Sequence, residues 1–221
     1  MRSAVRAVTH DMGEIDSDSL VPLVEAYAGN MRSIVTFLRA GGPVTCATSH
    51  GDTMLHAAAE GWQHTMVEFL IASGANPNAQ NDNGDTALHV VTLSRSCPSK
   101  GLFLKHIAPE EARRQTFFQL LFYGKTEAGI VNAQGVSALH LAATNGDALA
   151  VLQLTLERPQ LVDQLTAKGA PALFLAVLGG HAECARFLIA SGANVNFELK
   201  NGYRICDLIR SSDNAELSGL V

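Results

Sequence analysis

Histidine offers the most chemistry in this sequence, because eight histidines are present and an imidazole ring can act as a general base or hold a metal ion. Three of them, His56, His89 and His140, each come directly after a leucine and three positions after a threonine or serine. Neither a His-Glu-x-x-His nor a Glu-x-x-His spacing accompanies them, and a ligand set has to converge on one point. Equivalent side chains of a repeated structure are spread along it instead, so the sequence favours a structural role for these histidines.

The remaining candidates for catalysis are weak as well. No Gly-x-Ser-x-Gly segment and no phosphate-binding glycine loop is present, and no Ser-His-Asp set can be assembled from local signatures. The run Gly179-Gly180-His181 invites a nucleotide-binding interpretation, but a turn between two helices is the better account. The chain has no C-x-x-C spacing, which indicates reduced thiols at Cys46, Cys97, Cys184 and Cys206. We therefore expect no enzyme, no cofactor and no metal site.

Composition excludes further classes of function. The chain has 221 residues, of which 16 are basic and 21 acidic, and its formal net charge is −5. This balance provides no basic surface for DNA or RNA, so no nucleic-acid partner is expected. No apolar run reaches the roughly 20 residues of a membrane-spanning helix, and residues 1–19 lack a signal-peptide core. Together with reduced cysteines, these features predict a chain that works inside the cell, in the cytoplasm or nucleus, without a membrane partner.

A repeat with a period of about 33 residues organises the sequence and must position every candidate residue. Its opening pattern resembles Gly-Asp-Thr-x-Leu-His, with copies at 51–58, 84–89 and 135–142, a looser copy at 169–176 and degenerate copies at 21–26 and 202–209. The threonine position of these copies falls at 21, 53, 86, 137, 171 and 204, so four of the five spacings lie between 32 and 34. The segments 69–78 and 187–196 keep the same period almost letter for letter. Such a period predicts stacked repeat units.

Each unit is expected to be a pair of helices followed by a hairpin-like turn. Thr53 and Thr86 are suited to begin a helix, because a hydroxyl can accept a hydrogen bond from an unpaired backbone N–H at the helix start. Gly74 and Gly192 are suited to end the second helix, and the asparagine-rich residues 76–84 favour a turn. No single unit can bury its apolar stripe, so neighbouring units must stack.

These residues resemble the ankyrin repeat, whose family pattern is Thr-Pro-Leu-His-x-Ala followed about 21 residues later by Gly-Ala-Asp-Val-Asn. The resemblance covers residues 19–218 and implies an all-α ankyrin-repeat solenoid of five to six stacked helix-turn-helix units with hairpin-like turns. It also implies that the repeated histidines hydrogen-bond to the adjacent turn. Residues 1–18 are predicted to be an N-terminal extension, with its flexibility left open. The repeat domain is predicted at 19–221, with units near 19–50, 51–83, 84–134, 135–168 and 169–201 and a C-terminal cap at 202–221.

The third unit contains an insertion near residues 94–109. Between Thr86 and the helix-ending Gly124 there are 38 residues, against 21 between the equivalent positions of the second unit, so about 17 are extra. After the insertion, Pro109 is expected to begin a helix that runs through Leu121, because proline is favoured in the first turn. The sequence leaves open whether the insertion is a functional protrusion or a tolerated surface loop.

By resemblance, ankyrin proteins bind protein partners through the hairpin tips and the exposed positions of the first helix in each unit, which together form a concave face. In this sequence the corresponding partner-binding positions are Ser49, His50, Asp52, Glu60, Asp82, Asn83, Asp85, Leu93, Ala133, Gln134, Val136, Thr144, Ala167, Lys168 and Leu178. Asp52 and Asp85 are repeat-equivalent, so they are expected to project in parallel, with Glu60 and Asp82 on the same face. This acidic patch either suits a basic segment of a partner or is an ordinary solvated surface.

Trp62 and the pair Asn78 and Asn196 each have two possible explanations. Trp62 lies between the two helices of the second unit, where the family pattern has glycine. It is either an exposed hot-spot residue for a partner or a residue packed across the turn. Asn78 and Asn196 each lie eight residues after a leucine, a spacing similar to that in ankyrin substrates of asparaginyl hydroxylases. Stabilisation of the turn by side-chain to backbone hydrogen bonds is the simpler account of both.

The sequence thus predicts an intracellular adaptor or regulator that binds a protein through the concave face, and not an enzyme. The alternative is a regulatory or targeting subunit of a larger enzyme assembly, in which the insertion provides a second contact. Turnover by the purified chain, or a tightly bound metal, would instead indicate an enzyme.

Overall fold

Every regular element in the part of the chain that the structure describes is a helix. The computed structural model describes residues 17–93, 108–123, 126–199, 202–212 and 214–220. Twelve α-helices occur there in six consecutive pairs, as the sequence predicted. The pairs are α2 (Ser17–Tyr27) with α3 (Met31–Arg39), α4 (Met54–Glu60) with α5 (His64–Ala72), α6 (Ala87–Leu93) with α7 (Pro109–Phe118), α8 (Ala138–Asn145) with α9 (Ala148–Glu157), α10 (Ala172–Leu178) with α11 (Ala182–Ala190), and α12 (Ile205–Arg210) with α13 (Ala215–Ser218).

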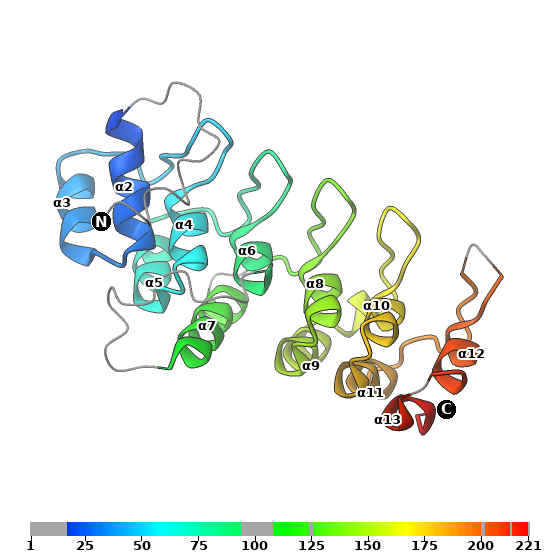
Figure 1. The fold of residues 1–221 in the computed structure, drawn as a ribbon. Helices are drawn as coiled ribbons and strands as arrows, with labels where there is room; N and C mark the ends of the chain where they lie inside the picture. The colour runs from blue at the N-terminus through cyan, green and yellow to red at the C-terminus, as the bar shows by residue number, and fades with distance from the viewer. Residues whose placement is uncertain (1–16, 94–107, 124–125, 200–201, 213, 221) are drawn as a thin grey trace. The chain divides into compact units, whose positions relative to one another are not determined.

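The chain divides into two compact parts, each made of several repeats. From here on we call them unit 1, which is Met1–Glu127, and unit 2, which is Ala128–Val221. Within each unit the first helices of successive pairs pack on one another, α2 on α4 and α4 on α6 in unit 1, and α8 on α10 and α10 on α12 in unit 2. The second helices form another layer, in which α5 packs on α7 in unit 1 and α11 packs on α9 and α13 in unit 2. A hairpin loop precedes each later first helix, as Figure 1 shows for α10 and α12.

One leucine of the first helix forms the centre of the core in four successive pairs. Leu55, Leu88, Leu139 and Leu173 are each no more than 2% exposed. The small residues that follow them are buried too, as at Ala142, and a small side chain lets neighbouring helices approach closely. The predicted stacking of apolar stripes is therefore confirmed within each unit.

A hydroxyl residue before the first helix pairs with the histidine three positions later. Thr53 Oγ1 lies 2.8 Å from His56 Nδ1, and the backbone N–H of Thr53 donates to the same nitrogen at 3.2 Å. Because Nδ1 accepts the bond from the backbone, the proton of the neutral ring is on Nε2. The same two distances recur in the pairs Thr86–His89 and Ser137–His140.

The opposite edge of the ring reaches the next repeat. His56 Nε2 donates to the main-chain oxygen of Asp85 at 2.9 Å, and His140 Nε2 donates to the main-chain oxygen of Gln164 at 2.8 Å. Both acceptors lie in the segment that leads to the following first helix. The expected hydrogen bonding to the adjacent turn is confirmed for His56 and His140, and these two rings also connect their repeats to the next ones.

Main-chain hydrogen bonds shape the hairpins and join them. Four hairpins are each closed by one antiparallel bridge, between Ala47 and Thr53, Val131 and Ser137, Leu165 and Pro171, and Glu198 and Arg204. The N–H of Asp82 donates to the oxygen of His50 at 2.9 Å in unit 1, and the N–H of Ala167 donates to the oxygen of Gln134 at 3.1 Å in unit 2. The backbone therefore holds neighbouring hairpins of a unit in register.

The helix expected after the insertion begins at Pro109, as predicted, with Glu110 and Glu111 in its first turn. Their negative charges stabilise the helix by interacting with the positive end of its dipole. The helix continues as a π-helical turn (Gln119–Tyr123) in which Leu121 is buried, so the expected extent through Leu121 is confirmed with a change of helix type.

Some sequence predictions fall outside the described residues. These are residues 94–107 of the insertion, the helix end at Gly124, and residues 1–16 of the expected N-terminal extension. The proposed domain boundaries remain predictions.

Left-handed backbone conformations occur where helices end. Gly74 and Gly192 follow α5 and α11 with φ of 94°, as the sequence predicted. Gly146 and Gly180 lie between the helices of their pairs with φ of 71° and 73°, and Trp62 takes the equivalent position in its pair with φ of 55°. This conformation costs a residue with a Cβ about 1 to 2 kcal/mol. Burial of a large apolar side chain contributes about 1.5 to 3 kcal/mol, so packing of the indole, which is 2% exposed, outweighs the strain.

Replacing Leu139, which is fully buried, by alanine should lower the free energy of unfolding by about 2 to 4 kcal/mol, because the change leaves a cavity in the core. Leu55→Ala and Leu173→Ala should behave in the same way. The control is Leu149→Ala, since Leu149 is 41% exposed on α9, and it should change this free energy by about 0.5 kcal/mol or less. Urea denaturation followed by circular dichroism measures each value. Equal losses for Leu139→Ala and Leu149→Ala would contradict this core.

Acid should destabilise unit 1 through His56. Burial lowers the pKa of its ring, while the carbonyl of Asp85 and the charges of Asp52 and Asp85 act more weakly in the opposite direction. The unfolded chain binds a proton near the ordinary histidine pKa of about 6.5, whereas the folded chain resists it. The contribution of His56 to stability is therefore complete above about pH 6.5 and is lost as the pH falls below that value.

The variant His56→Ala tests this linkage. It should lower the free energy of unfolding at neutral pH by about 1 to 3 kcal/mol, because the N–H of Thr53 and the main-chain oxygen of Asp85 lose their partner. It should also flatten the dependence of this free energy on pH below about pH 6.5. His64→Ala, at a half-buried position on α5, is the control. Urea titrations across this pH range measure both variants. Wild-type pH dependence in His56→Ala would show that this ring is not the titrating group.

Trp62 is the one tryptophan of the chain, so its fluorescence reports on the turn between α4 and α5. Because the indole is 2% exposed, the folded protein should emit at a shorter wavelength than the unfolded protein and should resist quenching by iodide. The red shift in urea should coincide with the loss of helical circular dichroism if both units unfold in one step. Quenching as efficient as that of tryptophan amide in the same buffer would contradict the burial of Trp62.

Candidate functional site

Two side chains that could carry chemistry, His56 and Cys184, are buried in the fold. Both ring nitrogens of His56 are used, one at the start of its own helix and the other by the main-chain oxygen of Asp85. Burial raises the pKa of the Cys184 thiol to about 11, with further contributions from the charges of Asp147 and Glu183, so little reactive thiolate forms at neutral pH. Across the described residues, no three His, Cys, Asp or Glu side chains are grouped to hold a metal ion.

No helix in the described part of the chain combines the length and the apolar character needed to cross a membrane.

The partner-binding positions predicted in unit 1 lie on its hairpins and at the ends of its first helices. We define the hairpin face of unit 1 as those positions that are not buried, which are Ser49, His50, Asp52, Glu60, Asp82, Asn83 and Leu93. Asp52 is half-buried and the others are exposed. The main-chain bond between Asp82 and His50 holds the two hairpins together, so their side chains share one surface.

Three acids give this face its charge. Asp52 Oδ1 accepts a hydrogen bond from Asn81 Nδ2 at 2.8 Å, which orients the carboxylate. Asp82 Oδ2 lies 3.6 Å from His50 Nδ1, and both side chains are exposed. Although Glu60 as a whole is exposed, reduced solvation of its carboxyl raises its pKa, and the charge of Asp52 raises it further. Asp52 and Glu60 therefore interact electrostatically, and a cation placed between them would stabilise both.

Two residues that the sequence analysis considered for the surface, Asp85 and Trp62, are buried. Asp85 is 8% exposed and does not stand beside Asp52 as an available acid. Its backbone N–H donates to Asn81 Oδ1 and its oxygen accepts from His56, which draws the residue into the stack. Trp62 is 2% exposed, so of the two alternatives for this residue the structure agrees with packing and contradicts an exposed contact residue. The large apolar area of an indole favours this burial, even though its Nε1 has no hydrogen-bond partner among the described residues.

The predicted positions of unit 2 have a different chemistry. They form the hairpin face of unit 2, which consists of Ala133, Gln134, Val136, Thr144, Ala167, Lys168 and Leu178. Val136 is half-buried and the others are exposed. Leu178, at the end of α10, is 73% exposed, and Lys168 carries the one charge among these residues.

Sequence reasoning missed three exposed apolar residues, which we include in the hairpin face of unit 2. Val131 and Leu165 close the hairpins before α8 and α10, with 36% and 43% of their surface exposed. Tyr203 lies two residues before α12 and is 59% exposed. Val131 and Leu165 are one repeat apart, and Tyr203 is repeat-equivalent to Val136. Comparison of residue types at equivalent positions of the period could have found them.

Asn78 and Asn196 lie in turns, but the side chains that accept hydrogen bonds from the turn backbone belong to other asparagines. Their backbone N–H groups donate to the side-chain oxygens of Asn76 and Asn194, both at 3.0 Å. Asn78 Oδ1 also accepts a hydrogen bond from the N–H of Glu127 at 2.8 Å. Hydroxylation of either asparagine stays a prediction of the sequence.

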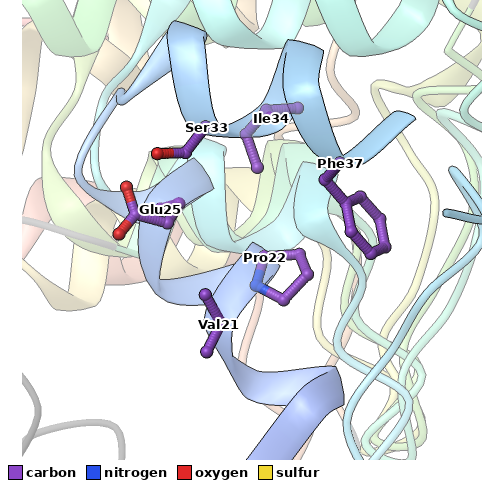
Figure 2. Close-up of a pocket in the computed structure, with 6 residues that line it drawn as sticks. All are labelled: Val21, Pro22, Glu25, Ser33, Ile34 and Phe37. Atoms are coloured by element: carbon purple, nitrogen blue, oxygen red, sulfur yellow. The ribbon is translucent and has the colours of Figure 1, made fainter. Parts of the chain in front are cut away.

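A pocket of about 390 Å³ lies between α2 and α3, and none of the residues of the hairpin face of unit 1 lines it. Its walls are Val21, Pro22, Glu25, Ser33, Ile34 and Phe37. Figure 2 shows Glu25 and Ser33 together at one side, with Pro22 and Phe37 at the other. One carboxylate and one hydroxyl do not pair a nucleophile with an oriented base, so the pocket offers apolar contact and no catalytic set.

Comparison with known sequences places these observations in a family. The family described as "Ankyrin repeats (3 copies)" matches residues 23–99 and 105–198, more than half of the chain. The B-cell lymphoma 3 protein homolog of Mus musculus is 29% identical over 194 residues, which are 85% of this chain and 40% of that protein. Rabankyrin-5 of Mus musculus is 28% identical over 158 residues, 72% of this chain and 12% of that protein. The chain thus spans less than half the length of these curated relatives.

Solved structures share the fold. The ankyrin repeat domain of Bcl-3 has a TM-score of 0.70 at 24% identity, over 89% of this chain and 82% of that one. An ankyrin repeat domain of Acinetobacter baumannii AYE has a TM-score of 0.75 at 19% identity, over 90% and 94% of the two chains. A chain in the complex of the Bd0816 predatory endopeptidase from Bdellovibrio bacteriovorus with the immunity protein Bd3460 has a TM-score of 0.71 at 20% identity, over 90% and 95%. Because the repeat pattern, the helix pairs with their hairpins and the family match agree, this chain belongs to the ankyrin-repeat family.

Proposed function

We propose that this chain is an intracellular adaptor or regulator that binds a protein partner through the hairpin faces of its units and does not catalyse a reaction. Ankyrin repeats are a protein-binding module, and repeat proteins of this kind use extended surfaces built from equivalent positions of successive repeats. A structural neighbour of this chain occurs in a complex of an endopeptidase with an immunity protein, which supports protein binding as a use of the fold.

The acidic character of the hairpin face of unit 1 carries the proposal. Asp52, Glu60 and Asp82 belong to this face, and none of its residues is a lysine or arginine. A basic segment of a partner would complement these acids and would offset the charge of Asp52, which adds to the effect of burial in raising the pKa of Glu60. Each exposed ion pair contributes only about 0 to 1 kcal/mol, so the main effect is faster encounter and selection against acidic partners.

Reversal of two exposed acids should slow the association of a basic peptide. The variant Glu60→Lys with Asp82→Lys should associate with a labelled peptide of alternating lysine and serine about tenfold more slowly than the wild type at low salt, and the difference should shrink at high salt because ions screen exposed charges. The control, Glu68→Lys with Glu157→Lys, makes the same change of net charge at exposed positions on second helices. Stopped-flow fluorescence anisotropy measures the rates.

The control separates a local surface from the overall charge. Equal slowing in the two double variants would show a general charge effect, and unchanged rates in both would show an ordinary solvated face. Either result would remove the basic segment from the proposal. Both variants should keep the wild-type free energy of unfolding within about 0.5 kcal/mol per substitution, so a large loss of stability is not expected to confuse the rates.

A further inference from the structure

The pocket between α2 and α3 lies on the first helix pair of unit 1. In the described part of the chain, α2 packs on α4, whereas α4 packs on both α2 and α6. Three residues of each helix line the pocket, with the same spacing i, i+1 and i+4 on both, namely Val21, Pro22 and Glu25 on α2 and Ser33, Ile34 and Phe37 on α3. The pocket is therefore built from one matching side of the two helices.

Equivalent positions of the next pair are filled. The N–H of Asn30 donates to the oxygen of Glu25, and the N–H of Gln63 donates to the oxygen of Ala58, so the two turns correspond with an offset of 33 residues, from 30 to 63. This offset is one more than the sequence spacing of 32 between 21 and 53. The six residues that correspond to the pocket walls are each no more than 2% exposed, and they are Met54, Leu55, Ala58, Met66, Val67 and Leu70.

Val21, by contrast, is 59% exposed. The same side of a helix pair is thus buried in the second pair, whose first helix has a neighbour on each side, and open in the first pair. The end of a repeat stack has to be covered or polar, because one of its faces lacks a neighbouring repeat. Val21, Pro22, Ile34 and Phe37 make this side of the first pair mainly apolar, so a cover is the solution that fits it.

Residues 1–16 are the part of the chain that leads directly into this pair, because α2 begins at Ser17. Val21 lies only four residues after Ser17. An extended chain of this length spans up to about 50 Å, so the segment can reach every wall of the pocket. Its covalent link to α2 also keeps its local concentration at the pocket high, which favours this occupant over a free one.

Apolar residues of this segment match the apolar walls. Val5, Val8 and Met12 have the spacing i, i+3 and i+7, which is typical of residues on one side of a helix. Ala7 and His10 fall on the opposite side at the same spacing. The sequence of the segment therefore offers one apolar stripe to the apolar side of the first pair.

Charges of the segment also match the pocket. Glu25 is the one charged residue that lines it, and it lies beside Ser33 at one side of the pocket (Figure 2). Arg2 and Arg6 are the basic residues of the segment, and both lie in its first half. Its acids lie in the second half, close to the start of α2, where negative charge stabilises a helix, and they are Asp11, Glu14 and Asp16.

We propose that residues 1–16 cover the pocket between α2 and α3, with Val5, Val8 and Met12 against its apolar walls and an arginine beside Glu25. The segment then acts as the N-terminal cap of the stack. Because the pocket is filled from within the chain, this end of unit 1 is closed to a partner and to a second copy. The inference concerns a surface apart from the hairpin faces and does not rest on the proposed function.

Hydrogen exchange of the full chain tests the cap. The variant Val5→Ser with Val8→Ser should raise the exchange rates of the backbone N–H groups of residues 17–39 about tenfold, because a first pair without its cover opens more often. The control, Ala7→Ser with His10→Ser, changes the opposite side of the stripe and should keep the wild-type rates. Mass spectrometry of peptides from residues 17–39 measures both variants.

Exchange of charges tests the placement of the arginines. The variant Arg2→Glu with Arg6→Glu should raise the same rates about threefold, because an exposed ion pair contributes little. Adding Glu25→Lys to this variant should restore the wild-type rates, since the opposite charges then face each other again. A general loss of stability would not be reversed by a third substitution, so the rescue reports on contact between the segment and Glu25.

Each contrary outcome overturns a stated part of the inference. Wild-type rates in Val5→Ser with Val8→Ser would show that residues 1–16 do not cover the pocket. Equal acceleration in the control would show an effect without a defined stripe and would also overturn the cap, and faster exchange without rescue by Glu25→Lys would overturn the placement of the arginines. A wild-type dimer in sedimentation velocity, dissociated by Val21→Ser, would identify a second copy as the occupant and would exclude residues 1–16.

Discussion

The stack depends on a neutral histidine ring that makes hydrogen bonds at both edges. In His56 and His140, Nδ1 accepts from the start of its own helix and Nε2 donates to the main chain of the next repeat. One side chain thus satisfies two backbone groups that would otherwise be buried without partners, which is costly in a packed interior. Where Phe174 replaces the histidine, main-chain bonds such as that from the N–H of Cys206 to the oxygen of Val195, at 2.8 Å, hold the next helix instead.

The helix pairs, their order and the role of the histidines could be predicted from the sequence because local and long-range signals agree there. Thr53 begins a helix whose Leu55 fills the core, and the same combination returns in the following units. The burial of Asp85 was not predicted, because it depends on contacts between neighbouring repeats. Packing of Trp62 remained one of two alternatives, because it depends on a backbone conformation that the repeat pattern assigns to glycine. The apolar face of unit 2 was missed for another reason, since the family pattern marks positions and does not compare the residue types that occupy them.

The two hairpin faces show how one architecture can carry two kinds of surface. The acids of unit 1 and the leucines and tyrosine of unit 2 stand on the same framework of first helix and hairpin. The framework contributes geometry, and the side chains contribute the chemistry. In the proposed function, the repeat framework defines where a partner contacts the chain, and the residues at those places define what kind of segment it offers.

The bonds between neighbouring hairpins also limit how this surface can evolve. They run from the N–H of Asp82 and of Ala167 to main-chain oxygens, so the identity of the side chain at either donor is irrelevant to the stack. Nineteen of the twenty amino acids supply that N–H, and proline does not. Partner preference can therefore drift at the hairpin tips by single substitutions without loss of the fold, and proline at these two places is the change that selection for stability would remove.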